Sequence, residues 1–160
     1  MATVLGTELP PLLMARLHPQ SAISNPQSVM LASTAVPICT LDPDGLPHPA
    51  MLSYAELAAD DTRRLRASVY GASSTARHLR ADGKVALIFV DAEGTYYVKA
   101  TVSGPDVPHP TSPAVAVFPL TIVAVLADAV DTSREPAAVI TSGIRFRRSP
   151  APPSAQGTSL

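Results

Sequence analysis

Leu41-Asp42-Pro43-Asp44-Gly45-Leu46-Pro47-His48 is a tight-turn sequence between two apolar segments, Ala35 to Leu41 and Ala50 to Leu57. Pro43 presets the φ angle of the second turn position, and Gly45 can adopt the left-handed conformation that closes a hairpin. This stretch therefore predicts two antiparallel strands joined by a short, rigid turn.

The hydrophobic pattern along the chain predicts four more strands, joined mostly by tight turns. A polar turn is expected at 58–62 and a Pro-rich loop at 105–113. Antiparallel strands that bury one face and hide their edges often close into a barrel. The predicted fold is mainly β, a six-stranded antiparallel barrel with peripheral helices, and the six strands are 36–41, 46–56, 65–70, 85–90, 95–103 and 115–127.

Outside the strands, the sequence predicts short helices at 10–17, 73–81 and 131–140, and a helical turn near 28–33. Residues 143–148 are expected to be a final extended piece, with the basic cluster Arg145 to Arg148 on a solvated face. Residues 1–148 are predicted to form one domain, whose residues 1–10 are a loose leader. The Pro-rich residues 149–160 are expected to be a disordered tail.

Composition excludes several classes of protein. The chain has 160 residues, 46% of them apolar, and a net charge of −1, which fits one domain and argues against a general nucleic-acid binder. Cys39 is the single cysteine, so no intrachain disulfide is possible and a cytoplasmic location is the default expectation. The longest apolar stretch, 114–127, is interrupted by Pro119 and is too short to span a membrane. No secretory signal peptide is recognised at the N-terminus.

The segment Ser73-Ser74-Thr75-Ala76-Arg77 combines three hydroxyl groups with an arginine at a predicted helix start. The first N–H groups of a helix lack partners, and the helix dipole favours an anion there. Arg77 adds a forked cation that suits a phosphate. From spacing alone, an ordinary capped helix with a solvated arginine is the simpler interpretation. Together with the rigid hairpin, however, this helix start has the arrangement of a flavin-phosphate site.

Residues 42–54 and 73–87 resemble the pyridoxamine 5′-phosphate oxidase-like FMN-binding split barrels. In that family a hairpin of this type precedes a strand that lies along the flavin ring, and a later helix start binds the FMN phosphate. The resemblance covers about residues 35–104. It implies a split β-barrel, FMN as cofactor, oxidoreductase activity on a small-molecule substrate, and a homodimer with the cofactor at its interface.

The resemblance also assigns roles to individual positions. The strand against the flavin ring corresponds to Met51, Leu52, Ser53 and Tyr54. The strand that meets the ribityl and phosphate region corresponds to Ser68, Val69 and Tyr70. The phosphate segment corresponds to Ser73, Ser74, Thr75 and Arg77, and a polar residue near the pyrimidine edge of the flavin corresponds to Lys99.

Three departures from the family pattern shape the functional prediction. Ser74 and Thr75 stand where the family has an adjacent basic pair, and Ala50 and Ala55 replace an arginine and a lysine of the true oxidases. The C-terminal segment that grips pyridoxal phosphate is not evident. Vitamin B6 oxidation is therefore not predicted, and the substrate is left open. The alternatives are a non-catalytic flavin carrier or sensor, and a reductase that uses a deazaflavin on the same fold.

No side chain is predicted to act as a nucleophile or a metal ligand. The four histidines lack the short spacing of metal ligands, and no Ser-His-Asp arrangement is recognised. Catalytic residues are thus unknown at this stage, and no metal is expected. Residues 18–34 and 105–113 are plausible pocket walls without an assigned role. The four histidines are His18, His48, His78 and His109.

Overall fold

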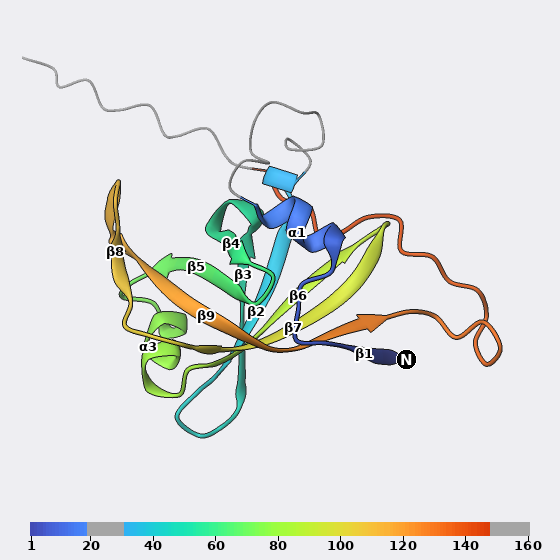
Figure 1. Cartoon of the computed structure of the whole chain (residues 1–160), viewed down its shortest axis with the longest axis horizontal. Helices are drawn as coiled ribbons and strands as arrows, with labels where there is room; N and C mark the ends of the chain where they lie inside the picture. The colour runs from blue at the N-terminus through green and yellow to red at the C-terminus, as the bar shows by residue number, and fades with distance from the viewer. Residues whose placement is uncertain (19–30, 148–160) are drawn as a thin grey trace, which may run out of the picture.

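The computed structural model describes residues 1–18 and 31–147. They form one curled antiparallel sheet of nine strands, in the order β3-β2-β6-β7-β9-β5-β4, with β1 and β8 also paired to β9 (Figure 1). This half-barrel is the split-barrel fold, so the predicted fold class is confirmed, although the strand count is higher than six. The strands are β1 (Ala2–Gly6), β2 (Ala35–Leu41), β3 (Pro47–Ser53), β4 (Leu57–Asp61), β5 (Arg64–Tyr70), β6 (Lys84–Asp91), β7 (Gly94–Val102), β8 (Val107–His109) and β9 (Ser112–Asp128).

Three short helical elements lie wholly within the described residues. Helix α1 (Pro11–Leu17) covers one end of the barrel, where Leu13 and Leu17 are buried in the core (Figure 1). The 3-10 helix η2 (Tyr54–Glu56) joins β3 to β4. Helix α3 (Ser74–Ala81) packs against β2 and β5. The helices predicted at 10–17 and 73–81 are therefore present.

The predicted hairpin forms β2 and β3, in register from Ala35 opposite Ser53 to Leu41 opposite Pro47. The Asp42 carboxylate accepts hydrogen bonds from the backbone N–H groups of Asp44 at 2.9 Å and Leu46 at 2.8 Å, and Gly45 has a φ of 77°. The second strand ends at residue 53 rather than 56. It ends there because Ser53 and Glu56 form a capping box that starts the 3-10 turn.

Strand β9 is the spine of the sheet, since its first half pairs with β5 and its second half with β7. Pro119 lies in the middle of this strand, opposite Arg66 of β5. Its carbonyl accepts from the Ser103 N–H at 2.9 Å, one residue beyond Val102, where β7 ends. The missing N–H of Pro119 therefore faces the space past the end of β7, and the ladder with β5 loses no hydrogen bond.

Two segments that were expected to be irregular are strands. The polar turn predicted at 58–62 is wrong: residues 57–61 form β4, because Leu57 and Ala59 point inward and bury their side chains, and the turn follows at Thr62 and Arg63. The loose leader is also wrong, since residues 2–6 form β1 and pair with the far end of β9. The Pro-rich loop contains β8, which pairs with the start of β9.

The helix predicted at 131–140 is absent. The backbone makes one turn, in which the Glu135 N–H donates to the Asp131 carbonyl at 2.9 Å. Pro136 follows and has no N–H with which to continue a helical ladder. Residues 136–144 then run without regular structure.

This C-terminal arm, residues 129–147, returns to the start of β2 (orange in Figure 1). The Ala35 N–H donates to the Ile144 carbonyl at 2.8 Å, and the Phe146 N–H donates to the Ser33 carbonyl at 2.9 Å. A Cβ atom on Gly143 would lie 2.3 Å from the Val90 carbonyl oxygen, so only glycine fits at this contact. Within the final extended piece predicted at 143–148, Arg145 forms an isolated β-bridge with Thr34. The predicted tail and most of the helical turn near 28–33 lie outside the described residues.

The part of the chain that the structure describes contains no helix long and apolar enough to cross a membrane.

Candidate functional site

The start of α3 presents hydrogen-bond donors at the end of β5. Ser73 caps the helix: its hydroxyl accepts from the Ala76 N–H at 3.1 Å and donates to the Tyr70 carbonyl at 2.7 Å. The N–H groups of Ser74 and Thr75, the first two helical residues, have no partner among residues 1–18 and 31–147. They are free to bind an acceptor at the positive end of the helix dipole.

Arg77 adds a cation to this helix start. Its guanidinium donates to the Ser74 hydroxyl at 2.8 Å, is exposed, and pairs with no carboxylate in the described chain. The first turn of α3 also carries no acidic residue. A positive side chain near a helix N-terminus is unfavourable by itself, because the dipole is positive there too. A bound anion would relieve this repulsion, so these groups fit a phosphate.

Not all of the hydroxyls predicted for this segment are available. The Ser73 hydroxyl is used in the cap, and Thr75 is buried. Arg77 is exposed and Ser74 is half-buried, so these two residues have the accessible side-chain donors of the segment. The donors left at this helix start are thus two side chains and the backbone N–H groups of Ser74 and Thr75.

Arg80 holds the loop that leads into this helix. Its guanidinium donates to the Gly71 carbonyl at 2.7 Å and to the Asp106 carboxylate at 2.9 Å, and it stacks over the Phe118 ring at 5.6 Å. The hydrogen bond from Arg80 lowers the pKa of Asp106. Arg80 is therefore committed to positioning the loop and is not a second phosphate cation. The sequence carried no signal for this contact.

The residues predicted to line the flavin ring, at the end of β3 and the start of η2, divide between the outer face and the core. Met51 points outward and is 60% exposed, whereas Leu52, Ser53 and Tyr54 are buried. The Tyr54 phenol accepts from Arg16 at 3.3 Å, and its burial raises its pKa. Arg16 also pairs with Asp91, which ties α1 to the end of β6. The Tyr54 side chain is therefore part of the core, and its hydroxyl is bonded to Arg16 of α1.

The residues predicted on β5 divide in the same way. Val69 is buried, Ser68 is half-buried, and Tyr70 points outward with 71% of its surface exposed. Tyr70 lies directly before the loop to α3, and its carbonyl accepts from the Ser73 N–H at 3.0 Å.

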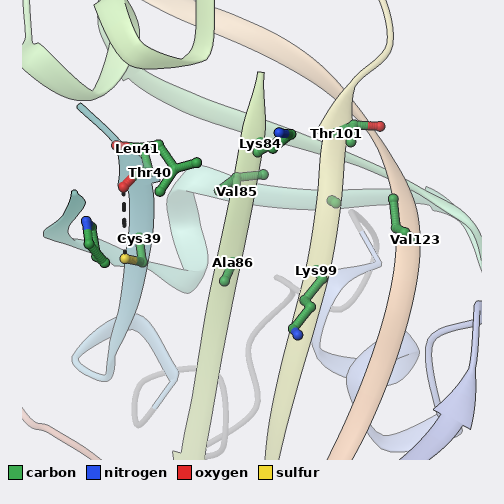
Figure 2. Close-up of a pocket in the computed structure, with 11 residues that line it drawn as sticks. Cys39, Thr40, Leu41, Lys84, Val85, Ala86, Lys99, Thr101 and Val123 are labelled. Atoms are coloured by element: carbon green, nitrogen blue, oxygen red, sulfur yellow. Dashed lines mark hydrogen bonds between the residues drawn. The ribbon is translucent and has the colours of Figure 1, made fainter. Parts of the chain in front are cut away.

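Lys99 lies elsewhere, in a groove of about 510 Å³ on the outer face of β2, β6 and β7 (Figure 2). Among the predicted site residues, Lys99 alone lines this groove. The groove is at the hairpin end of the sheet, close to the C-terminal end of α3, whereas the phosphate segment is at the other end of that helix. Its walls are mostly apolar and are formed by Cys39, Thr40, Leu41, Pro47, Lys84, Val85, Ala86, Lys99, Ala100, Thr101 and Val123.

The groove continues into an apolar outer face. Side chains directly opposite on antiparallel strands lie on the same face of the sheet. Met51 is opposite Pro37, and a second row runs from Ile88 through Tyr97 and Leu126 to Val4 of β1. Met51 and Val4, at the ends of this face, are 60% and 66% exposed.

Two histidines meet beneath α3. The His78 ring is buried, with Nδ1 2.9 Å from the Thr40 hydroxyl, and the His48 ring packs edge-on against it with centroids 4.8 Å apart. This contact fastens α3 to the hairpin. No group of three or more metal-ligating side chains occurs within the described ranges.

The sequence profile of the pyridoxamine 5′-phosphate oxidase family matches residues 25–125. The match covers more than half of the chain, including the hairpin, the helix start and most of β9. The chain belongs to the pyridoxamine 5′-phosphate oxidase-like family. The resemblance expected from residues 35–104 is thereby confirmed, and the family's flavin-binding fold is shared by this chain.

Solved structures of family members have the same fold. An FMN-binding protein from Syntrophomonas wolfei subsp. wolfei is 16% identical, with 62% of this chain and 80% of that chain covered and a TM-score of 0.51. The styrene monooxygenase flavin reductase from Pseudomonas putida S12 is 10% identical, with 66% and 86% covered and a TM-score of 0.52. An F420 reductase is 18% identical, with 64% and 98% covered and a TM-score of 0.50. No curated protein sequence matches the chain.

The start of α3 offers a set of donors that would fit a phosphate group. The free N–H groups, the Ser74 hydroxyl and the Arg77 guanidinium are the donor set that a phosphate requires. Sequence reasoning missed the groove residues Lys84 and Cys39, because no local motif marks them. The alternation of β6 and the register of the hairpin place them on the outer face.

Proposed function

We propose that this protein is an FMN-binding flavoprotein that acts as an oxidoreductase on a small molecule. The observation that carries the proposal is the α3 start, where an arginine and two backbone N–H groups lie beside the β5 end. Within the described residues the arginine has no carboxylate partner and the N–H groups have no acceptor. FMN would supply the hydride or electron transfer, while the protein binds and orients it. No side chain need act as a nucleophile, which suits a site without an identifiable catalytic group.

In this proposal the phosphate binds at Ser74 and Arg77, with the backbone N–H groups of Ser74 and Thr75. The flavin ring then extends along the exposed edge of β3, next to Met51. One arginine replaces the adjacent basic pair found in the family, so we expect weaker phosphate binding than that pair would give. Vitamin B6 oxidation is not proposed, because Ala50 and Ala55 cannot provide the charges of the true oxidases.

We further propose a homodimer in which two outer faces meet around the cofactor. The predicted ring-edge residue Lys99 is exposed in the groove on the outer sheet face, so a flavin ring there would have a wall on one side only in a single chain. A second copy related by a two-fold axis can supply the missing wall. The exposed apolar row that ends at Met51 and Val4 supports this interface, since such faces are typical of contacts between proteins.

Two alternatives use the same fold. A deazaflavin-dependent reductase is favoured by Lys84 and Lys99 in the groove, since a longer acidic cofactor tail calls for added cations, and an F420 reductase shares the fold. A non-catalytic flavin carrier or sensor is favoured by the loss of the basic pair. A reducing compartment such as the cytoplasm suits the free Cys39 thiol in the groove.

The test is a comparison of FMN with riboflavin, which lacks the phosphate. Each ligand is titrated into the protein while quenching of flavin fluorescence is followed. We expect FMN to bind at least about tenfold more tightly, the scale of one charge-assisted hydrogen bond. Equal affinities would overturn the phosphate site, and binding of a deazaflavin in preference to FMN would favour the first alternative.

A further inference from the structure

The use of lysine in this chain is confined to one place. The sequence has twelve lysines and arginines in total, and only Lys84 and Lys99 are lysines. Both line the groove on the outer sheet face (Figure 2). Lys84 is opposite Thr101 and Lys99 is opposite Ala86, so the two lysines are diagonal neighbours on adjacent strands.

The arginines serve other purposes. Most of those in the described chain form ion pairs with carboxylates that hold elements together: Arg16 with Asp91, Arg63 with Glu8, Arg64 with Asp61, Arg66 with Asp60, Arg80 with Asp106 and Arg134 with Asp131. By contrast, Lys99 has no hydrogen bond or ion pair with residues 1–18 or 31–147. Lys84 has only the Asp82 carboxylate at 4.0 Å, the limit of an ion pair. The fold therefore leaves the ammonium groups of Lys84 and Lys99 available to bind a ligand.

The groove around the two lysines is apolar. Its walls are mostly apolar side chains such as Leu41, Pro47 and Val123, and no carboxylate lines them. Diagonal neighbours in an antiparallel sheet are about 7–8 Å apart at the backbone. Lysine side chains are long and flexible and both of these are exposed, so their two ammonium groups can turn toward one anion bound in the groove.

We infer that this groove binds a small organic anion with an apolar body, whose carboxylate, sulfonate or phosphate group is held by Lys84 and Lys99. The apolar body would lie against Leu41, Pro47 and Val123. A volume of about 510 Å³ is within the range of small-molecule sites. The inference rests on the proposed function only where it identifies this anion as the substrate of the flavin-dependent reaction. Binding of the anion itself requires no flavin.

The first experiment compares naphthalene-2-carboxylate with its neutral isostere, naphthalene-2-carboxamide. Calorimetric titration of the full chain, with and without FMN, should show roughly tenfold tighter binding of the carboxylate. Lys84→Met and Lys99→Met should each remove most of this preference and leave carboxamide binding unchanged. Arg64→Met is the matched control: its side chain is 66% exposed, compared with 68% for Lys84, and it should retain the preference.

Equal binding of the two naphthalenes by the native protein would overturn the inference, as would a loss in Arg64→Met as large as that in Lys99→Met. The second result would indicate a general charge effect. Failure of both ligands to bind would also overturn the inference.

Lysine acetylation provides an independent measurement. The only amines that an acetylating reagent can modify are Lys84, Lys99 and the terminal amine, and mass spectrometry separates the three from each other and from Cys39. Naphthalene-2-carboxylate should slow acetylation of both lysines severalfold. Two controls should show no slowing: the terminal amine in the same sample, and both lysines when naphthalene-2-carboxamide replaces the carboxylate. Unchanged lysine rates at saturating carboxylate would contradict the inference.

Failure of this inference can be distinguished from failure of the proposed function. Carboxylate preference in a protein that binds no FMN would leave the anion groove standing and would overturn the flavin proposal. FMN binding without carboxylate preference would support the flavin proposal and overturn the anion groove.

Discussion

Replacement of Arg77 by alanine tests the phosphate site most sharply. Arg77 is exposed, makes one hydrogen bond to Ser74 at 2.8 Å and has no carboxylate partner in the described chain. Its loss should therefore cost the fold little, within about 0.5 kcal/mol. If its guanidinium binds the FMN phosphate, the variant loses a charge-assisted hydrogen bond of roughly 1.5–3 kcal/mol, so FMN affinity should fall about 10- to 150-fold.

The assay is fluorescence titration with FMN and with riboflavin, together with thermal unfolding of the free protein. Riboflavin affinity should not change, because riboflavin carries no phosphate. Arg134→Ala is the matched control, since Arg134 also bonds an exposed side chain three residues earlier, Asp131, and should bind FMN as the native protein does. Unchanged FMN affinity in Arg77→Ala, or an equal loss for riboflavin, would refute the reasoning.

Three further predictions concern the arm, the loop and the interface. Gly143→Ala should lower the free energy of unfolding by about 1–3 kcal/mol in urea titrations, because its Cβ would meet the Val90 carbonyl oxygen at 2.3 Å. Arg80→Met should destabilise the protein by up to about 1 kcal/mol at pH 7. Because Arg80 lowers the pKa of Asp106, this ion pair stabilises the fold above about pH 4, and the difference between variant and native protein should shrink as the pH falls through that lowered pKa. Met51→Glu should convert the proposed dimer to a monomer in light-scattering measurements, since it buries charge in the apolar face.

Each of these has a contrary result. For the arm, Gly104→Ala is the control, because its Cβ would contact only the Pro119 ring, at 3.5 Å. An equal loss of stability in the two variants would contradict the claim that the contact with the Val90 carbonyl requires glycine at position 143. For the loop, a difference between Arg80→Met and native protein that is constant from pH 7 to pH 2.5 would exclude a contribution from ionised Asp106. For the interface, a native protein that is monomeric at micromolar concentration would contradict the dimer.

Local chemistry explains why much of the fold was predictable from sequence. The Asp42 carboxylate that bonds the turn, the left-handed Gly45 and the Ser73 cap are all contacts within a few residues. Such contacts leave a mark in the sequence. The hairpin and α3 were therefore predicted at nearly their observed positions.

The errors came from segments whose structure depends on distant partners. Strand β1 is a strand because the end of β9 offers it a free edge, and β4 because β5 pairs with its acidic and alanine-rich residues. The helix expected at 131–140 is limited to one turn because Pro136 has no N–H with which to continue it. Likewise, the groove combines Cys39, Lys84 and Lys99 from three strands, and only the register of the sheet brings them together.

The most direct test of the central claim is the visible absorption spectrum of the purified protein, recorded before and after addition of FMN and removal of the excess. The account predicts a flavin spectrum that the protein retains through removal of free FMN and loses in Arg77→Ala. A protein that is colourless both before and after FMN addition would contradict the claim that the start of α3 holds a flavin phosphate.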